Sequence, residues 1–196
     1  MTAEIYLHVV RHGQSSWNAQ HRIQGQTPHV PLTPAGEQQA REAARQLKDC
    51  GATAVYTSDL RRAVQTAIPI ARQLGVMMTL DGDLRERSLG ELEGSCSDQA
   101  WAAAGAAGAQ PSRRIRGGES VEDVTMRVRR FLRRVRLHAA DGSPVVAVTH
   151  GDTACILVGV LRGDVPGQQP RAKWANGQVM TVRCRWQGEA LSPVRE

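Results

Sequence analysis

IYLHVVRHG, at residues 5–13, is an apolar, β-prone run that ends in two basic residues and a glycine. The pattern is typical of a buried strand leading into a loop that begins with Arg11 and His12. A second run, PVVAVTHG at residues 144–151, is continuous enough for a central strand covered on both faces, and it ends at His150. Two predicted strands therefore each deliver a histidine at their carboxyl end.

Helical patterns lie between these strand-like runs. Thr33 offers an N-cap followed by proline, and alanine and leucine recur at helical spacing until Gly51. The sequence AVYT at residues 54–57 predicts another strand, after which Asp59 can cap a helix that ends at Gly75. Strand and helix alternate, which predicts an α/β fold: a mostly parallel central sheet with helices on both faces, in three α/β/α layers.

The second half of the chain continues the alternation. Ser120, with Asp123 three residues later, begins a helix whose apolar stripe leaves Arg127 and other arginines largely outside it, so we expect most of them to be solvated. Residues 178–186 predict a last strand followed by a short polar tail.

Length and composition narrow the function classes. A chain of 196 residues with 41% hydrophobic content fits one domain with a real core. No apolar stretch approaches a bilayer span and no leader-like start is present, so we expect a soluble, cytoplasmic protein. The four cysteines lie far apart without metal-ligand spacing. A net charge of +6 favours anionic partners, whereas 4% aromatic content argues against a single-strand nucleic-acid binder.

The two strand-end histidines carry the chemistry. In open α/β sheets the ligand crevice lies at the carboxyl ends of the strands, so His12 and His150 are expected to converge there. A neutral imidazole can attack phosphorus, and a second histidine with Arg11 would bind the phosphoryl group and spread its charge, without a metal. Either histidine alone would more simply be a core residue bonded to backbone, and only their combination favours the catalytic interpretation.

Several ordered motifs resemble the histidine phosphatase superfamily, which includes the cofactor-dependent phosphoglycerate mutases. The resemblance extends from about residue 5 to residue 151, and Asn176 is a late echo of it. The matching segments are RHGQSSWN at 11–18, QG at 24–25, PLT at 31–33 with Gly36, SDLRRAVQTA at 58–67, Glu86 with Gly90 and EG at 93–94, GGES at 117–120, and THG at 149–151.

The resemblance implies a role for each matching residue. His12 would be the nucleophile, and Glu86 would protonate the leaving oxygen and then activate water. The residues expected around the phosphoryl group are Arg11, Asn18, Gln24, Gly25, Arg62, His150 and Gly151. Arginine suits this task because its planar fork gives paired, charge-assisted bonds to phosphate. For Glu86 the competing interpretation is a surface glutamate paired with a neighbouring arginine. No metal and no cofactor are expected.

The organisation implied is one histidine phosphatase domain over residues 1–196, with a small insertion or lid at about 95–118. Arg113, Arg114 and Arg116 in that insertion could meet a further anionic group of the substrate, or could be solvated loop charges. The Gly25–Pro31 segment departs from the family pattern, and His29 within it receives no catalytic role. Asp152 stands where relatives carry a small residue, and we favour a helix-capping role for it over discrimination against heavily phosphorylated substrates.

The function expected is a phosphomonoesterase for a small phosphorylated metabolite, with neither nucleic acid nor membrane as partner and with a homodimer left open. A phosphoglycerate mutase is the alternative, disfavoured because the segment between Glu86 and His150 is shorter than in the true mutases. A basic nucleic-acid-binding module, suggested by the nine arginines between Arg113 and Arg136, is less favoured. A third option is a degenerate phosphatase fold used for protein contacts. It is disfavoured because reactive residue types occupy all five key positions, namely Arg11, His12, Arg62, Glu86 and His150.

Overall fold

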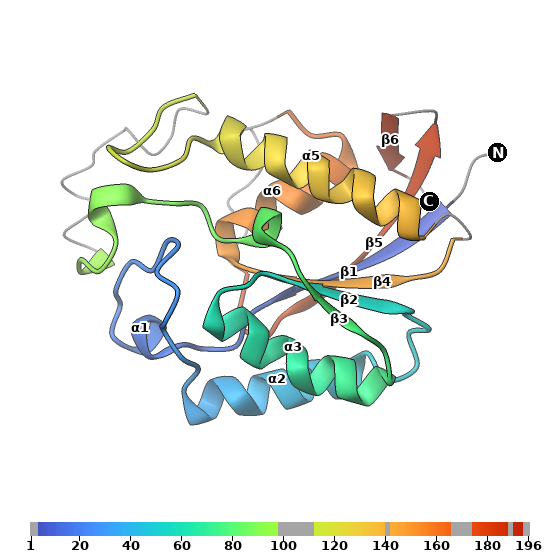
Figure 1. Cartoon of the computed structure of the whole chain (residues 1–196), viewed down its shortest axis with the longest axis horizontal. Coiled ribbons are helices and arrows are strands. Elements are labelled where there is room, and N and C mark those ends of the chain that lie inside the picture. Colours follow the sequence, from blue (N-terminus) through green and yellow to red (C-terminus); the bar gives the residue numbers. More distant parts are fainter. Residues whose placement is uncertain (1–3, 98–111, 140–141, 166–173, 188–189, 194–196) are drawn as a thin grey trace.

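The structure is a computed structural model that describes residues 4–97, 112–139, 142–165, 174–187 and 190–193 of the 196. Strands and helices alternate along most of the chain (Figure 1). In chain order the elements are β1 (Glu4–Arg11), α1 (Ser16–Ala19), α2 (Pro34–Gln46), β2 (Ala54–Thr57), α3 (Arg61–Leu74), β3 (Met78–Leu80), the 3-10 turns η1 (Gly82–Leu84) and η2 (Gly90–Leu92), α5 (Val121–His138), β4 (Val145–Thr149), α6 (Gly151–Arg162), β5 (Val179–Gln187) and β6 (Ala190–Pro193).

The described strands form one sheet in the order β3-β2-β4-β1-β5-β6. Strands β3, β2, β4 and β1 run parallel, and β5 and β6 continue the sheet in antiparallel fashion. Helices α5 and α6 cover one face of this sheet and α2 and α3 cover the other (Figure 1). The predicted three-layer α/β fold with a mostly parallel sheet is therefore confirmed.

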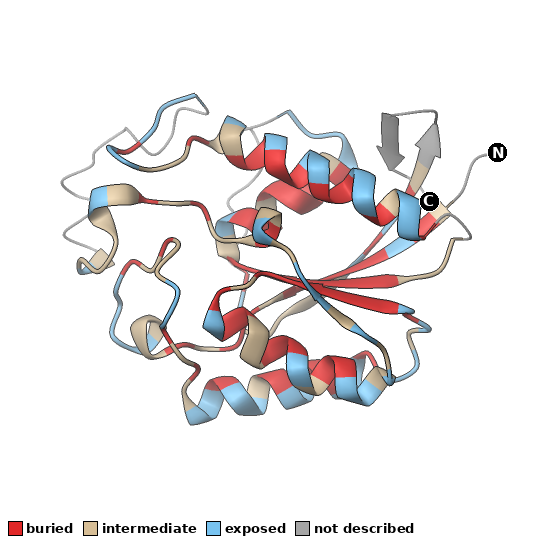
Figure 2. Ribbon diagram, viewed as in Figure 1, coloured by how far each residue is buried: buried red, intermediate tan, exposed pale blue. Residues whose placement is uncertain are grey.

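Each face of the sheet has its own core, because successive side chains of a strand point to opposite faces. On the α5/α6 face, Leu7 and Val9 pack in one cluster with Phe131. On the α2/α3 face, Val10 packs with Val146 and the alanines of the two helices. The central strands and the inner sides of the helices are accordingly buried (Figure 2). A sheet buried on both faces fixes the strand ends where the candidate site lies.

Most helix boundaries follow the local signals. Thr33 caps α2 by accepting the Gly36 N–H, and Ser120 and Asp123 form a capping box at α5. Gly75 ends α3 with a left-handed φ of 67°. The α2 helix ends at Gln46, before the expected Gly51.

Two other local expectations were wrong. The side chain of Asp59 does not cap α3; its carboxylate accepts from Arg85 Nε at 2.7 Å instead, so a tertiary ion pair replaces the local cap. The expected polar tail contains strand β6, which pairs with β5.

Residues 98–111, the middle of the expected insertion, lie outside the described residues.

Most arginines of α5 are exposed, as expected, and Arg127 is the exception. It is 5% exposed, and its Nε donates to the Glu119 carboxylate at 2.9 Å. Its Nη groups donate to the carbonyls of Asp83 at 2.7 Å and Glu86 at 3.1 Å. Arg127 therefore ties α5 to the segment that carries Glu86.

Among the described helices, none combines the length and apolar character that a bilayer crossing requires.

Candidate active site

Three neighbouring strands end side by side at the candidate site. Strand β4 lies between β1 and β2, and the residues that follow these three strands are His150, His12 and Ser58. The backbone N–H of His12 donates to Thr149 O at 2.9 Å, and that of Ser58 donates to Val148 O at 3.0 Å. The sheet hydrogen bonding thus extends past the strand ends and fixes the three side chains relative to one another.

The two predicted histidines meet, as expected. Their ring centroids are 5.0 Å apart in an edge-on arrangement with an interplanar angle of 61°. His12 Nδ1 lies 2.7 Å from the carbonyl oxygen of Gly13, which only a protonated Nδ1 can donate to, so the neutral ring keeps a lone pair on Nε2. Burial, followed by the charges of Arg62 and Arg11, lowers the pKa of His12 well below its ordinary value. The ring is therefore neutral near pH 7 and fixed in one tautomer.

His150 is held through its other nitrogen. Its Nε2 lies 2.9 Å from Ser58 Oγ, which also accepts the Leu60 N–H at 3.3 Å. Burial and the positive charge of Arg62 lower the pKa of His150 well below its ordinary value, so this ring is also neutral. The Ser58 hydroxyl can donate to Nε2, and in that arrangement the hydrogen of the neutral imidazole is on Nδ1.

The two predicted arginines are held by carbonyl oxygens. Arg62 is 0% exposed and donates from Nη1 to Thr27 O at 3.0 Å and from Nη2 to Gly25 O at 2.8 Å. Arg11 donates from Nη1 to the carbonyl of Trp174. Burial lowers the pKa of Arg62 to about 10, against the opposing effect of Glu86, so the guanidinium remains charged at neutral pH.

Buried polar atoms without a partner mark the centre of the site. Five buried side-chain atoms of the described residues have no hydrogen-bond partner. Arg11 Nε, Arg62 Nε and His150 Nδ1 belong to predicted site residues, and the other two are His8 Nε2 and Arg87 Nη2. Buried donors are normally paired because leaving one unpaired costs about 1–3 kcal/mol. Three such atoms around His12, two of them on cations, are suited to an anion.

The side chain of Glu86, from the segment between η1 and η2, lies against the first turn of α6. Its Oε1 accepts the backbone N–H groups of Arg87 at 2.9 Å and Thr153 at 3.2 Å. The Thr153 hydroxyl lies 3.2 Å from Oε1, but it is closer to the Arg85 carbonyl, at 2.8 Å. Glu86 Oε2 accepts only the Asp152 N–H in the described residues, at 3.4 Å. A Cβ on Gly151 would lie 3.7 Å from both Glu86 Oε2 and the Arg11 guanidinium carbon. The carboxylate therefore stands beside Arg11 with one oxygen lightly engaged.

The same geometry bears on Asp152. Asp152 stands in the first turn of α6, where a negative charge is favourable, and the Glu86 carboxylate accepts the N–H groups of Asp152 and Thr153 in the same turn. Asp152 itself is exposed in that turn, and its charge acts on Arg11.

The other predicted phosphate-binding residues flank the histidines. The side-chain oxygen of Asn18 accepts from Ser15 N at 3.0 Å and from Asn176 Nδ2 at 3.2 Å, which leaves its amide nitrogen for a ligand. Gln24 accepts the Ser15 hydroxyl at 2.7 Å. The carbonyl of Gly25 accepts a hydrogen bond from Arg62, so Gly25 acts on the site through the guanidinium that it holds.

Three further residues were not expected from their chemistry. Ser58 and Thr66 stand inside a recognised motif, yet only the structure gives them partners: Thr66 Oγ1 accepts the Gly13 N–H at 3.0 Å. Ser58 could have been found by the rule that placed the histidines, since it follows a predicted strand. Thr153, which holds Glu86, follows the second histidine by three residues and carried no signal of its own.

Residues assigned no firm role lie toward the surface. His29 is exposed and its ring is edge-on to Trp17. Arg113 and Arg116 are exposed, and Arg114 pairs with Asp123 at 2.6 Å.

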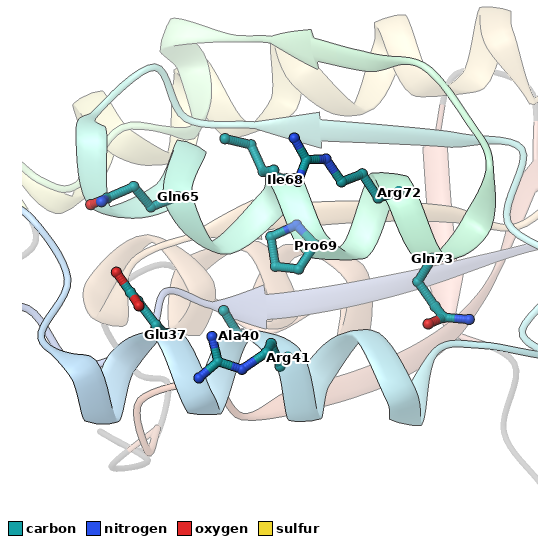
Figure 3. Close-up of a pocket in the computed structure, with 8 residues that line it drawn as sticks. All are labelled: Glu37, Ala40, Arg41, Gln65, Ile68, Pro69, Arg72 and Gln73. Atoms are coloured by element: carbon teal, nitrogen blue, oxygen red, sulfur yellow. The ribbon is translucent and has the colours of Figure 1, made fainter.

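A separate groove runs between α2 and α3 and contains none of the predicted site residues (Figure 3). It is lined by Glu37, Ala40, Arg41, Gln65, Ile68, Pro69, Arg72 and Gln73. In the described part of the chain, histidine, cysteine and carboxylate side chains form no cluster suited to a metal ion.

A buried pair of neutral histidines between two arginines, at the carboxyl edge of an α/β sheet, defines a class of phosphoryl-transfer protein. The chain belongs to the histidine phosphatase superfamily (branch 1), whose family profile matches residues 7–195.

Individual relatives are similar over most of their length. The chain is 37% identical over 184 residues to a probable phosphoglycerate mutase GpmB of Salmonella paratyphi C, covering 91% of this chain and 84% of that protein. The structure of a mycobacterial glucosyl-3-phosphoglycerate phosphatase in complex with VO3 superposes with a TM-score of 0.88 at 28% identity, over 96% of this chain and 95% of that one. Bacillus stearothermophilus YhfR gives 0.83 at 26% identity, over 98% and 96%.

Proposed function

We propose that the protein hydrolyses the phosphomonoester of a small metabolite through a phosphohistidine on His12, without a metal or cofactor. One observation carries the proposal: a neutral, buried His12 keeps its Nε2 lone pair beside three buried polar atoms that have no protein partner. A neutral imidazole is a nucleophile for phosphorus, and the charges of Arg11 and Arg62 stabilise the phosphoryl oxygens in the transition state.

The first half-reaction forms the phosphoenzyme. His12 Nε2 attacks phosphorus in line, the bond from phosphorus to the ester oxygen breaks, and Glu86 donates a proton to the departing alcohol. Oε2 is the oxygen of Glu86 that carries this proton, because Oε1 already accepts two backbone N–H hydrogen bonds. His150 donates from Nδ1 to a phosphoryl oxygen, and Asn18 donates from its amide.

The second half-reaction releases phosphate. The Glu86 carboxylate takes a proton from water, the water oxygen attacks phosphorus, and the bond to Nε2 breaks, which restores neutral His12. The enzyme returns to its starting state, with Glu86 protonated again and His12 neutral, while the ester and water have become alcohol and phosphate. One carboxyl group thus serves first as acid and then as base.

The experiment is a phosphate-release assay over a panel of metabolite phosphates, with and without chelator. We expect turnover that is indifferent to chelator and is abolished in His12→Ala, together with radiolabel from substrate trapped on the wild-type chain. Glu86→Gln should slow an alkyl phosphate far more than an aryl phosphate, because only the poorer leaving group needs the proton. Equal slowing of both esters would refute Glu86 as the acid, and an active His12→Ala would refute the nucleophile.

A mutase is the second candidate, favoured by the name of the relative in Salmonella. The two activities differ in the acceptor of the phosphoryl group, which is water in one and a hydroxyl of the substrate in the other. Incubation of each phosphoglycerate isomer distinguishes them: the phosphatase releases inorganic phosphate, and the mutase interconverts the isomers with little release.

A further inference from the structure

We propose that Glu93 is a positioning residue that fixes Arg62 for phosphate binding by holding the 24–27 loop in place. The inference rests on the proposed function, because it assigns Arg62 to the phosphoryl group. The role assigned to Glu93 is to act on Arg62, chiefly through the loop, and not on the reacting atoms.

The carboxylate of Glu93 links two segments that are distant in sequence. Its Oε1 accepts the Gln26 N–H at 3.1 Å, and its Oε2 lies 3.4 Å from the Thr27 hydroxyl. The same Oε1 accepts the Leu89 N–H at 3.0 Å and the Ser88 hydroxyl at 3.1 Å. One carboxylate therefore joins the loop to the turn that follows Glu86.

The loop held in this way supplies the direct partners of Arg62. The carbonyls of Gly25 and Thr27 lie on either side of Gln26, and they accept from the two Nη groups at 2.8 and 3.0 Å. Because the guanidinium is planar, fixing both Nη groups also fixes the direction of Nε–H. Movement of the loop would therefore redirect the one Arg62 atom that is buried without a partner.

Gly25 is required for this close approach. Its φ is +46°, and a Cβ there would lie 2.1 Å from Glu93 Oε1. A backbone that approaches a carboxylate so closely excludes any side chain, which indicates that the loop and Glu93 are fitted to each other. Glu93 also contributes charge, since it opposes the lowering of the Arg62 pKa.

The test measures the affinity of inorganic phosphate by calorimetry, with kcat and KM for an aryl phosphate alongside. Glu93→Gln keeps one acceptor oxygen and removes the charge, and we expect phosphate binding weakened about tenfold, as for loss of a hydrogen bond to a charged group. Glu91→Gln is the matched control: the residue is exposed on η2, and losing its charge should change affinity less than about twofold.

A double-mutant cycle distinguishes positioning from a purely structural role. In an Arg62→Met background, Glu93→Gln should cost less than about twofold in phosphate affinity, because the residue through which it acts is gone. An equal tenfold loss in that background would overturn the inference. So would a Glu93→Gln protein with a lowered melting temperature and unchanged phosphate affinity.

A second variant keeps the test decisive if Glu93→Gln does not fold. Gly25→Ala forces the loop and the carboxylate apart, and it should weaken phosphate binding at least as much; unchanged affinity would overturn the inference. Failure of the proposed function gives a different result, since the wild-type chain would then neither release phosphate nor form a phosphohistidine. An active wild type with Glu93→Gln equal to Glu91→Gln refutes this inference alone.

Discussion

Ser58→Ala tests whether a hydroxyl sets the tautomer of His150. In the structure Ser58 Oγ accepts the Leu60 N–H and lies 2.9 Å from His150 Nε2, to which its hydroxyl can donate. Without that hydrogen the neutral ring is free to move its proton to Nε2. Nδ1 would then present a lone pair to a phosphoryl oxygen. His150 would repel that oxygen instead of donating a hydrogen bond to it.

The magnitude follows from the burial of the pair. Both residues are 0% exposed, so water cannot replace the lost partner. A buried acceptor left unsatisfied costs about 1–3 kcal/mol, which corresponds to roughly 5- to 150-fold in rate. Removal of one donor to a developing oxyanion falls at the upper end of this range or above it. We therefore expect kcat/KM for an aryl phosphate to fall about 10- to 100-fold.

The assay combines steady-state kinetics with nitrogen NMR of the histidine rings, which reports the tautomer directly. Thr57→Val is the control, because it removes a neighbouring buried hydroxyl that bonds the Ser58 carbonyl at 3.1 Å and does not touch His150. Ser58→Ala should lose activity and change the tautomer, while Thr57→Val should lose only stability. A wild-type His150 found protonated at Nε2, or a folded Ser58→Ala with full kcat/KM, would refute the reasoning.

Three other predictions follow from burial and charge. Because the pKa values of His12 and His150 are lowered in the folded state, the unfolded chain binds more protons below about pH 6.5. The free energy of unfolding, measured with urea, should therefore fall as pH decreases below that value, by up to about 1.4 kcal/mol per pH unit for each ring. The acidic limb of kcat/KM should also lie below pH 6.5. A free energy of unfolding that stays constant down to pH 5 would contradict this. Arg127→Ala removes the ion-pair partner of Glu119, whose side chain is 22% exposed, and the donor to two buried carbonyls. It should cost about 3 kcal/mol of unfolding free energy, with a lower kcat because Glu86 loses a backbone anchor; a cost under 1 kcal/mol would show that the ion pair is not needed. Phe131→Ala opens a cavity in the α5 core and should cost about 3–5 kcal/mol with kcat retained in the folded fraction, as checked by denaturation and active-site titration.

The parts of the fold predicted from the sequence are those with strong local signals. The strand that ends at His150 is apolar without interruption because both of its faces are buried, and the helix starts at Thr33 and Ser120 carry capping residues. The convergence of His12 and His150 followed from one rule about strand ends. These features depend on periodicity and on chain direction, which the sequence contains.

The features that were missed depend on tertiary partners. Asp59 has the residue type of an N-cap, but Arg85, 26 residues later, competes for its carboxylate. Arg127 lies outside the apolar stripe of its helix, and its burial becomes favourable only with Glu119 and two carbonyls as partners. Strand β6 is short, and its pairing with β5 was not visible as a pattern. A local pattern cannot identify partners that the chain brings together only on folding.

The hydrogen-bond partners of five arginines distinguish structural cations from the two assigned to the substrate. Arg85, Arg127 and Arg134 donate directly to carboxylates, so their charges are neutralised within the protein. Arg62 and Arg11 donate to neutral carbonyl oxygens instead. A carbonyl fixes the guanidinium without cancelling its charge, and the nearby carboxylates Glu86 and Glu93 act on Arg62 only from a distance. Holding a cation by dipoles leaves its full charge for a phosphoryl group, and this arrangement is invisible in a sequence where all five residues are simply arginine.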